Sequence, residues 1–198
     1  MPRVSDQHLA ARRQQIVDAA RTTFSRQGFR TTTMHDVIAE AGLSVGAVYR
    51  YFKSKEDLIT AIVDQVMNEV GGRVDDLTTE RPCRPIDDFL TAVLSVMEPE
   101  LGPDGTFRVA LQVWSESLHS PALGELVATM MGRLRVRFGT YTRGLQEEGR
   151  LPADADPMGL ASVLLAMIQG YALQRVLSDG PDPASYVAGL RTLRTLSS

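Results

Sequence analysis

The sequence predicts an all-α protein, and three features support this fold class. Apolar residues recur three and four positions apart along most of the chain, which is the spacing of one helix face. Capping residues, glycines and prolines separate these segments, and no run alternates between apolar and polar residues over strand length. The chain has 198 residues, of which 43% are hydrophobic and 23% charged, so it can bury a sizeable core. We expect about nine helices.

The first two helices are marked by their ends. Apolar residues repeat at helical spacing along the first helix, at Ile16, Ala20 and Phe24. Gly28 follows where a left-handed residue would end that helix. Thr33 and Asp36, three residues apart, form a capping box that starts the second helix, and Gly42 ends it.

A third helix is predicted from Ser44 to Phe52, and a fourth starts at Ser54 and ends at Gly71-Gly72. The two short helices before Ser54 form a helix-turn-helix over residues 33–52, whose second helix would enter the DNA major groove. We therefore expect a DNA-binding domain over residues 1–54 and a second domain over 55–198.

The second predicted domain is also helical. A fifth helix is expected over Ile86 to Met97, before the breakers Pro99, Gly102 and Pro103. A sixth carries an apolar stripe from Phe107 to Leu118. Three later helices begin with a capping residue followed by proline, at Ser120-Pro121, Asp156-Pro157 and Asp182-Pro183.

Charge is distributed unevenly. The net charge is −3, but residues 1–55 contain nine basic and four acidic residues, so the excess of negative charge lies in the remainder. A basic first segment on an acidic body is typical of a protein that binds a polyanion at one end. Chance clustering of charge is the alternative.

The expected compartment is the cytoplasm. Cys83 is the only cysteine, so no intramolecular disulfide can form. The first 15 residues contain no apolar stretch typical of a signal peptide. Residues 158–173 are strongly apolar but shorter than a membrane span of about 20 residues. We expect no membrane association.

The residues around the third helix suit a nucleic-acid partner. Tyr49 can donate to a phosphate, and Arg50 can bind a guanine edge or a phosphate. Lys53 and Lys55, the only lysines, flank the start of the fourth helix, where backbone amides favour an anion. Hydroxyl side chains lie at the other helix starts: Thr32, Thr33 and Ser44.

Two details of this surface have alternatives. Helical spacing places Val48, Phe52 and Val45 on one face, which is expected to pack on the first two helices. Tyr51 suits packing and phosphate contact equally, and the hydroxyl residues also serve as helix caps. Gly46 costs about 1 kcal/mol inside a helix relative to alanine, which close approach of DNA would offset.

The run FSRQGFRTTTMHDVIAEAGLSVGAVYRYFKSKEDLI resembles the DNA-binding domain of the TetR family of bacterial transcriptional regulators. The pattern continues without a gap over some 45 residues and is highly specific to that family. The resemblance implies phosphate contacts from Thr33, Ser44, Tyr49, Tyr51 and Lys55. It also implies that Val45, Gly46 and Arg50 lie nearest the bases.

Three short segments of the second predicted domain carry a further pattern: WSESL at 114–118, SPAL at 120–123 and LLAMIQGY at 164–171. Through them the domain resembles, more diffusely, the sensing and dimerising part of choline-responsive repressors. Methionines and aromatic residues there can line an adaptable pocket, and a plain core is the alternative. The candidate pocket residues are Met67, Phe89, Val93, Met97, Phe107, Leu111, Trp114, Leu118, Met130, Met131, Phe138, Tyr141, Met167 and Tyr171. Because no acid is clearly directed inwards, we expect a small apolar or weakly polar effector.

The last two helices are expected to form a homodimer. Residues 158–177 are apolar nearly all round, and a helix of this kind must be covered on every side. Two copies of both helices can form a four-helix bundle with two-fold symmetry. The candidate interface residues are Leu160, Val163, Ala166, Met167, Gly170, Leu173, Tyr186, Leu190 and Leu193.

The sequence gives little support for catalysis, a cofactor or a metal. Its three histidines are widely spaced, and neither a metal-ligand motif nor a glycine-rich phosphate loop occurs. The leading hypothesis is therefore a repressor that binds a palindromic operator as a dimer and is released by a small ligand. The alternative is an architectural or cell-division protein that binds DNA in the same way but senses no ligand.

Overall fold

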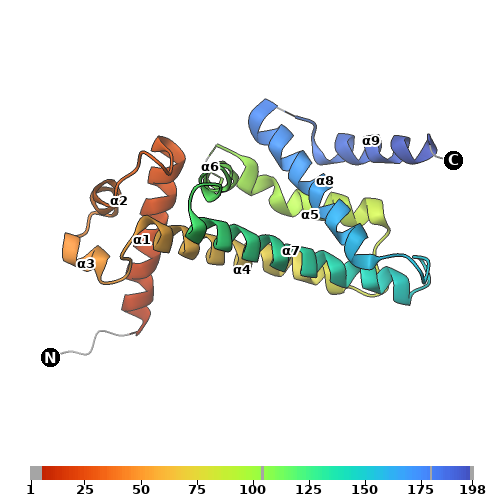
Figure 1. Ribbon diagram of the computed structural model, residues 1–198, viewed down its shortest axis with the longest axis horizontal. Coiled ribbons are helices and arrows are strands. Elements are labelled where there is room, and N and C mark those ends of the chain that lie inside the picture. The colour runs from red at the N-terminus through yellow and green to blue at the C-terminus, as the bar shows by residue number, and fades with distance from the viewer. Residues whose placement is uncertain (1–5, 104, 179, 197–198) are drawn as a thin grey trace. The chain divides into compact units, whose positions relative to one another are not determined.

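The computed structural model describes residues 6–103, 105–178 and 180–196. Within these ranges the chain forms nine helices and no strand, which confirms the predicted fold class (Figure 1). The helices are α1 (Asp6–Gln27), α2 (Met34–Ala41), α3 (Val45–Tyr49), α4 (Lys55–Thr79), α5 (Ile86–Leu101), α6 (Phe107–Ser117), α7 (Pro121–Glu147), α8 (Pro157–Ser178) and α9 (Pro183–Thr195).

The predicted capping residues hold the helix starts. The Thr33 hydroxyl accepts from the Asp36 amide, while the Asp36 carboxylate accepts from the Thr33 amide at 2.7 Å, which completes the capping box. Ser44 caps α3 through the Ala47 amide. Gly42 ends α2 at φ 63°, a left-handed conformation that favours glycine.

The chain folds as two compact units. The first unit contains the described residues up to Val66 and the segment 105–126, and the second contains residues 67–103 and 127–196 without Asp179. The helices α4 and α7 each contribute to both units. This grouping places α6 in the same unit as α1, α2 and α3.

The first unit is built on α1, which packs against α2 and α6, while α3 packs on α2. Its core contains Ile16, Phe24, Val37, Val48 and Leu58, all fully buried. The connection after α1 is held in place from α6, because the Gln112 side chain accepts a hydrogen bond from the Phe29 amide. Gly28 in this connection has φ 91°, so a side chain there would be strained.

In the second unit α5 packs against α8 and α9 (Figure 1). The core is aromatic, with Phe89 stacked on Tyr141 at 3.7 Å between ring centroids and Phe138 edge-on to Phe89 at 6.1 Å. The Tyr141 hydroxyl donates to the Arg84 carbonyl at 2.9 Å, so its polar atom is satisfied inside the protein.

Two predicted helix ends are wrong. The fourth helix does not stop at Gly71-Gly72 but continues to Thr79. The Arg137 guanidinium of α7 lies against Gly71, donates to the Met67 carbonyl and pairs with Asp75 at 2.8 Å. The missing side chain of Gly71 therefore makes room for this crossing arginine, so tertiary packing overrides the low helix propensity of glycine.

The fifth helix likewise extends past its expected end to Leu101, with Pro99 inside it. Proline lacks the amide that would bond the carbonyl of Ser95, four residues earlier. Ser95 is exposed, so water can satisfy that carbonyl and the helix can continue.

Candidate nucleic-acid interface

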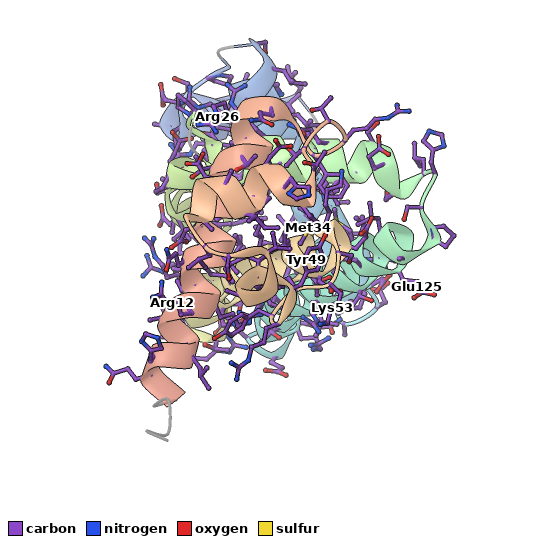
Figure 2. The ribbon with its side chains drawn as sticks, turned by 90° about the vertical axis from the view of Figure 1, so that its left-hand side faces the viewer. Arg12, Arg26, Met34, Tyr49, Lys53 and Glu125 are labelled. Atoms are coloured by element: carbon purple, nitrogen blue, oxygen red, sulfur yellow. The ribbon has the colours of Figure 1, made fainter. Side chains whose placement is uncertain are left out.

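The short helix α3 presents one face to its own unit and another to solvent. Val48 and Phe52 are buried, as predicted. Val45, however, is 48% exposed, so the prediction that it packs with them is wrong. Tyr49 is 37% exposed, as its position in Figure 2 shows. Gly46 is also exposed, and together with Val45 these residues form an outward surface.

No contact with the described part of the chain requires glycine at position 46. A Cβ atom at this position would meet no atom within 4 Å, and its backbone is not left-handed. Glycine inside a helix costs about 1 kcal/mol relative to alanine. The open space in front of Gly46 therefore favours close approach of an external partner, as expected for a helix in the major groove.

The predicted hydroxyl groups do not all face solvent. Thr32 is only 1% exposed, and its hydroxyl donates to the Gly28 carbonyl at 2.7 Å. The prediction that this hydroxyl is a DNA contact is wrong for this conformation, because the group is buried and already bonded. Thr33 and Ser44 are exposed, although both hydroxyls also serve as helix caps.

The two lysines contact the protein's own backbone. Lys55 Nζ donates to the carbonyls of Phe29 and Arg30 at 2.8 and 3.2 Å and lies 4.8 Å from the centre of the Phe29 ring. Lys53 Nζ donates to the Tyr49 carbonyl. An ammonium group has three donors, so each lysine keeps hydrogen-bonding capacity for a phosphate.

The structure adds two residues that the sequence prediction missed. A concavity lies beside α3, and its wall on α1 includes His8 and Arg12. Its opposite wall includes the predicted contacts Arg50 and Tyr51, and Tyr51 is half-buried. The spacing of four between His8 and Arg12, on one face of an amphipathic helix, was the available signal in the sequence.

The predicted effector residues are distributed over both units. Phe107, Leu111 and Trp114 are half-buried in the first unit, where Phe107 lies edge-on to Trp114 at 5.4 Å. Leu118 follows the last residue of α6 and is 80% exposed. The prediction that Leu118 lines a pocket is therefore wrong, because its side chain is exposed to solvent at the end of α6.

In the second unit several predicted effector residues form the packed interior. Phe89, Val93, Phe138, Tyr141 and Tyr171 are buried, as is Met67. The Phe89 ring stacks on Tyr141 and lies edge-on to Phe138, so these three predicted pocket residues pack against one another. The remaining methionines of the prediction are half-buried: Met97, Met130, Met131 and Met167.

The second unit also contains an inward acid that the sequence did not indicate. Glu98 of α5 accepts a hydrogen bond from the buried Tyr171 hydroxyl and pairs with Arg175 of α8 at 3.0 Å. Burial acts to raise the pKa of Glu98, but hydrogen bonds from Arg175 and Tyr171 outweigh it, and the pKa is lowered. Burial and the contact with Glu98 raise the pKa of Tyr171. This network is charged yet internally compensated.

A groove of about 350 Å³ runs between α5, α8 and α9. Ion pairs from Arg191 and Arg194 to Asp87, at 2.8 and 2.9 Å, join α9 to α5 beside it. Five of the predicted dimer residues line the groove: Leu160, Val163, Met167, Leu190 and Leu193. Val163 and Leu193 are among the most exposed large apolar residues of the described chain, so the structure leaves an apolar surface where the prediction places a partner.

The remaining predicted dimer residues belong to the same two helices. Ala166 is exposed, while Gly170 and Leu173 are half-buried. The Tyr186 hydroxyl of α9 donates to the Met167 carbonyl of α8 at 2.8 Å, which fixes these helices to each other.

Two further observations concern metals and membranes. No group of three or more histidine, cysteine or acidic side chains that could hold a metal is present in the described ranges. Among the same residues, α8 alone is long and apolar enough to cross a membrane by length and composition, a property shared by core helices of soluble proteins.

Comparison with known families agrees with this arrangement. A family model described as bacterial regulatory proteins of the tetR family matches residues 16–62. A second model, described as the C-terminal part of a BetI-type transcriptional repressor, matches residues 85–194. The BetI transcriptional regulator of Cronobacter sakazakii is 29% identical over 203 residues, which cover 100% of this chain and 91% of that protein.

Solved structures show the same fold. GusR of Salmonella enterica superposes with a TM-score of 0.74 at 21% identity, covering 97% of this chain and 96% of its own. A transcriptional regulator from Saccharomonospora viridis, solved in complex with choline, has a TM-score of 0.72 at 25% identity. That match covers 92% of this chain and 95% of the other.

Proposed function

This chain belongs to the tetR family of bacterial regulatory proteins, and we propose that it binds a palindromic operator as a homodimer and leaves it when a small effector binds. The chain is a DNA-binding transcriptional regulator. The observation that carries the proposal is the outward face of α3, where Val45, Gly46 and Tyr49 are exposed opposite the buried Val48. A protein that works on bacterial DNA acts in the cytoplasm.

The proposed contacts follow from this face. Tyr49 binds a phosphate through its hydroxyl, and Arg50 reads a base edge or binds a phosphate. Thr33, Ser44 and Lys53 supply further donors at the edges of the helix-turn-helix. Lys55 contributes a phosphate contact through the ammonium donor that its two backbone carbonyls leave free.

The proposed dimer uses the groove along α8 and α9. A palindromic operator presents two half-sites about one helical turn, or 34–36 Å, apart, so a two-fold dimer positions two copies of α3 for them. The exposed apolar residues Val163 and Leu193 of one copy would lie against the groove of its partner. An isologous interface of this kind closes after two copies, so the groove itself is not left free for further assembly.

The effector is proposed to be small and apolar or weakly polar. Glu98, the acid that accepts a hydrogen bond from the buried Tyr171, is already compensated by Arg175, so it does not offer an unpaired charge to a cationic ligand. Choline, the ligand of the Saccharomonospora viridis relative, is the principal alternative. An aromatic interior can hold a quaternary ammonium group through ring faces alone, without a carboxylate.

The proposed response is a change in the equilibrium between two conformations. An effector can release DNA only if it binds the non-DNA-binding conformation better, and operator DNA must then weaken effector binding by the same factor. Coupling of this kind typically amounts to about 1–3 kcal/mol. The helix α4 contributes to both units, so it is the element proposed to connect the two sites.

Operator binding is tested by selecting the genomic fragments that the purified protein retains, then measuring affinity for the selected duplex. One or a few sites near a gene for a transporter or enzyme are expected, whereas many scattered sites would favour the architectural alternative. Tyr49→Phe should weaken binding to every duplex, and Arg50→Ala should relax base preference by about 1–3 kcal/mol at one position if it reads a guanine. Unchanged retention of the selected duplex by the double variant would refute the assignment of α3.

Effector binding is tested by titrating choline and a panel of small neutral compounds into the protein with and without the selected duplex. A cognate effector should bind more weakly when the duplex is present. Choline that binds with equal affinity in both cases is not the effector. If every compound in the panel binds free and DNA-bound protein with equal affinity, the proposal that the protein responds to an effector is wrong.

A further inference from the structure

A concavity of about 310 Å³ lies in the first unit, between α1 and the helix-turn-helix. Three parts of the chain line it: His8, Leu9 and Arg12 of α1, then Gly42, Leu43 and Ser44 of the turn, and then Ala47, Arg50 and Tyr51 at α3. These residues include two arginines, a histidine, a phenol and a hydroxyl, and no acid. The lining therefore offers several hydrogen-bond donors, and its arginines carry positive charge with no carboxylate beside them in the lining.

Among the side chains that the structure describes, the arginines of this concavity have no acidic partner, unlike Arg26 of α1. Within the described ranges Arg12 bonds to the neutral amide of Gln15 at 2.8 Å, and neither Arg12 nor Arg50 makes an ion pair. On the same helix α1, Arg26 pairs with Glu40 at 2.8 Å. Arg12 and Arg50 carry like charges and line the same concavity, so they repel each other. An anion bound in the concavity would offset this repulsion.

The position of the concavity identifies the anion. Ala47, Arg50 and Tyr51 occupy the flank of α3 that adjoins α1, while Val45 and Tyr49 form the outward face. A helix in the major groove, which is about 12 Å wide, has a phosphate strand along each flank. Figure 2 shows Arg12 on α1 to one side of Tyr49 and Lys53 toward the other side.

We infer that this concavity binds a backbone phosphodiester of duplex DNA, with Arg12 of α1 as a contact from outside the helix-turn-helix. Arg12 and Tyr51 donate to the phosphate oxygens from the two walls, and a guanidinium can do so with two parallel hydrogen bonds. The inference rests on the proposed function. It adds a second wall to the DNA-binding surface, so that one phosphate strand lies between α1 and α3.

The test compares Arg12→Gln with Arg26→Gln, which removes the same charge from the same helix at the pair with Glu40. Each variant is titrated with sonicated calf-thymus DNA and with the selected operator duplex at several salt concentrations. A lost phosphate contact should reduce the slope of log affinity against log salt by about 0.9. At about 0.1 M salt this corresponds to an affinity about eightfold lower for both DNAs.

Arg26→Gln should keep the wild-type slope, and Arg12→Lys should restore most of the slope because an ammonium also binds phosphate. Circular dichroism melting of each variant shows whether the fold is retained. If Arg12→Gln keeps the wild-type slope, or if both glutamine variants lose it equally, the inference is wrong. Each variant is also titrated with inorganic phosphate. An Arg12→Gln variant that loses phosphate binding but keeps the wild-type affinity for both DNAs would identify a site for free anions and overturn the inference too.

Failure of the inference is distinguishable from failure of the proposed function. A wild-type protein that binds no duplex would remove the proposed function itself. A wild type that binds DNA and is weakened by Tyr49→Phe but not by Arg12→Gln would remove only the concavity from the interface.

Discussion

Replacing Tyr171 with phenylalanine tests the charged network of the second unit. The change removes the hydroxyl that donates to Glu98 and keeps the ring, which lies 5.2 Å edge-on from Tyr186. A hydrogen bond to a charged group contributes about 1.5–3 kcal/mol. Since Arg175 still compensates Glu98 in the variant, we expect a loss at the low end, about 1.5–2 kcal/mol.

Tyr186→Phe is the matched control. Its hydroxyl donates to the Met167 carbonyl, a neutral acceptor, so its loss should amount to about 0.5–1.5 kcal/mol. The two variants differ further in their pH dependence. The lowered pKa of Glu98 means that its ionised form stabilises the fold above the ordinary value of 4.5, and this contribution is lost as pH falls below it toward the folded value.

The assay is urea unfolding followed by circular dichroism, at one protein concentration and at several pH values between neutral and acid. The deficit of Tyr171→Phe should be largest near neutral pH and shrink in acid, whereas that of Tyr186→Phe should stay constant. In thermal melts the neutral-pH deficit should lower Tm by about 3–8 °C. Equal deficits for both variants at every pH would refute the reasoning that Glu98 is held as an anion by Tyr171.

Two further predictions concern α4 and the dimer. Gly72→Ala should stabilise the protein by about 0.5–1 kcal/mol because its position is open, whereas Gly71→Ala should gain less or destabilise, since its Cβ would lie 2.2 Å from Arg137. Urea unfolding of both variants measures their free energies of unfolding. Equal increases for Gly71→Ala and Gly72→Ala would contradict the prediction, because they would show that Arg137 moves aside without cost. Ala166→Arg on the exposed face of α8 should give monomers in light scattering, while Val136→Arg on α7 should remain dimeric. A dimeric Ala166→Arg variant would contradict the proposed interface.

Local signals made most of the fold predictable. Helix starts depend on one side chain and the next turn, so Ser44, Thr33 and Asp182 could be identified as caps from the sequence alone. The end of α4 could not, because Gly71 is explained by Arg137, some 65 residues away in the chain, and not by local propensity.

The sequence indicated which residues belong to the candidate site better than it indicated whether each side chain faces solvent or the interior. The outward position of Tyr49 follows from helical spacing, and the structure agrees with it. The burial of Thr32 depends on how the connection after α1 folds back on Gly28. Glu98 precedes Pro99, which suggested a helix break, so its inward position on α5 was not visible in the sequence.

The hydrogen bond from Phe29 to Gln112 joins residues separated by 83 positions. The unit that contains the helix-turn-helix is therefore not encoded by one uninterrupted stretch of gene. A chimera made by a single crossover after the first 66 residues would join α1 of one parent to α6 of the other, and the Phe29 amide would need a new acceptor. Recombination between relatives would succeed most readily when the connection after α1 and the α6 surface come from the same parent, so these two distant segments are expected to change together during evolution.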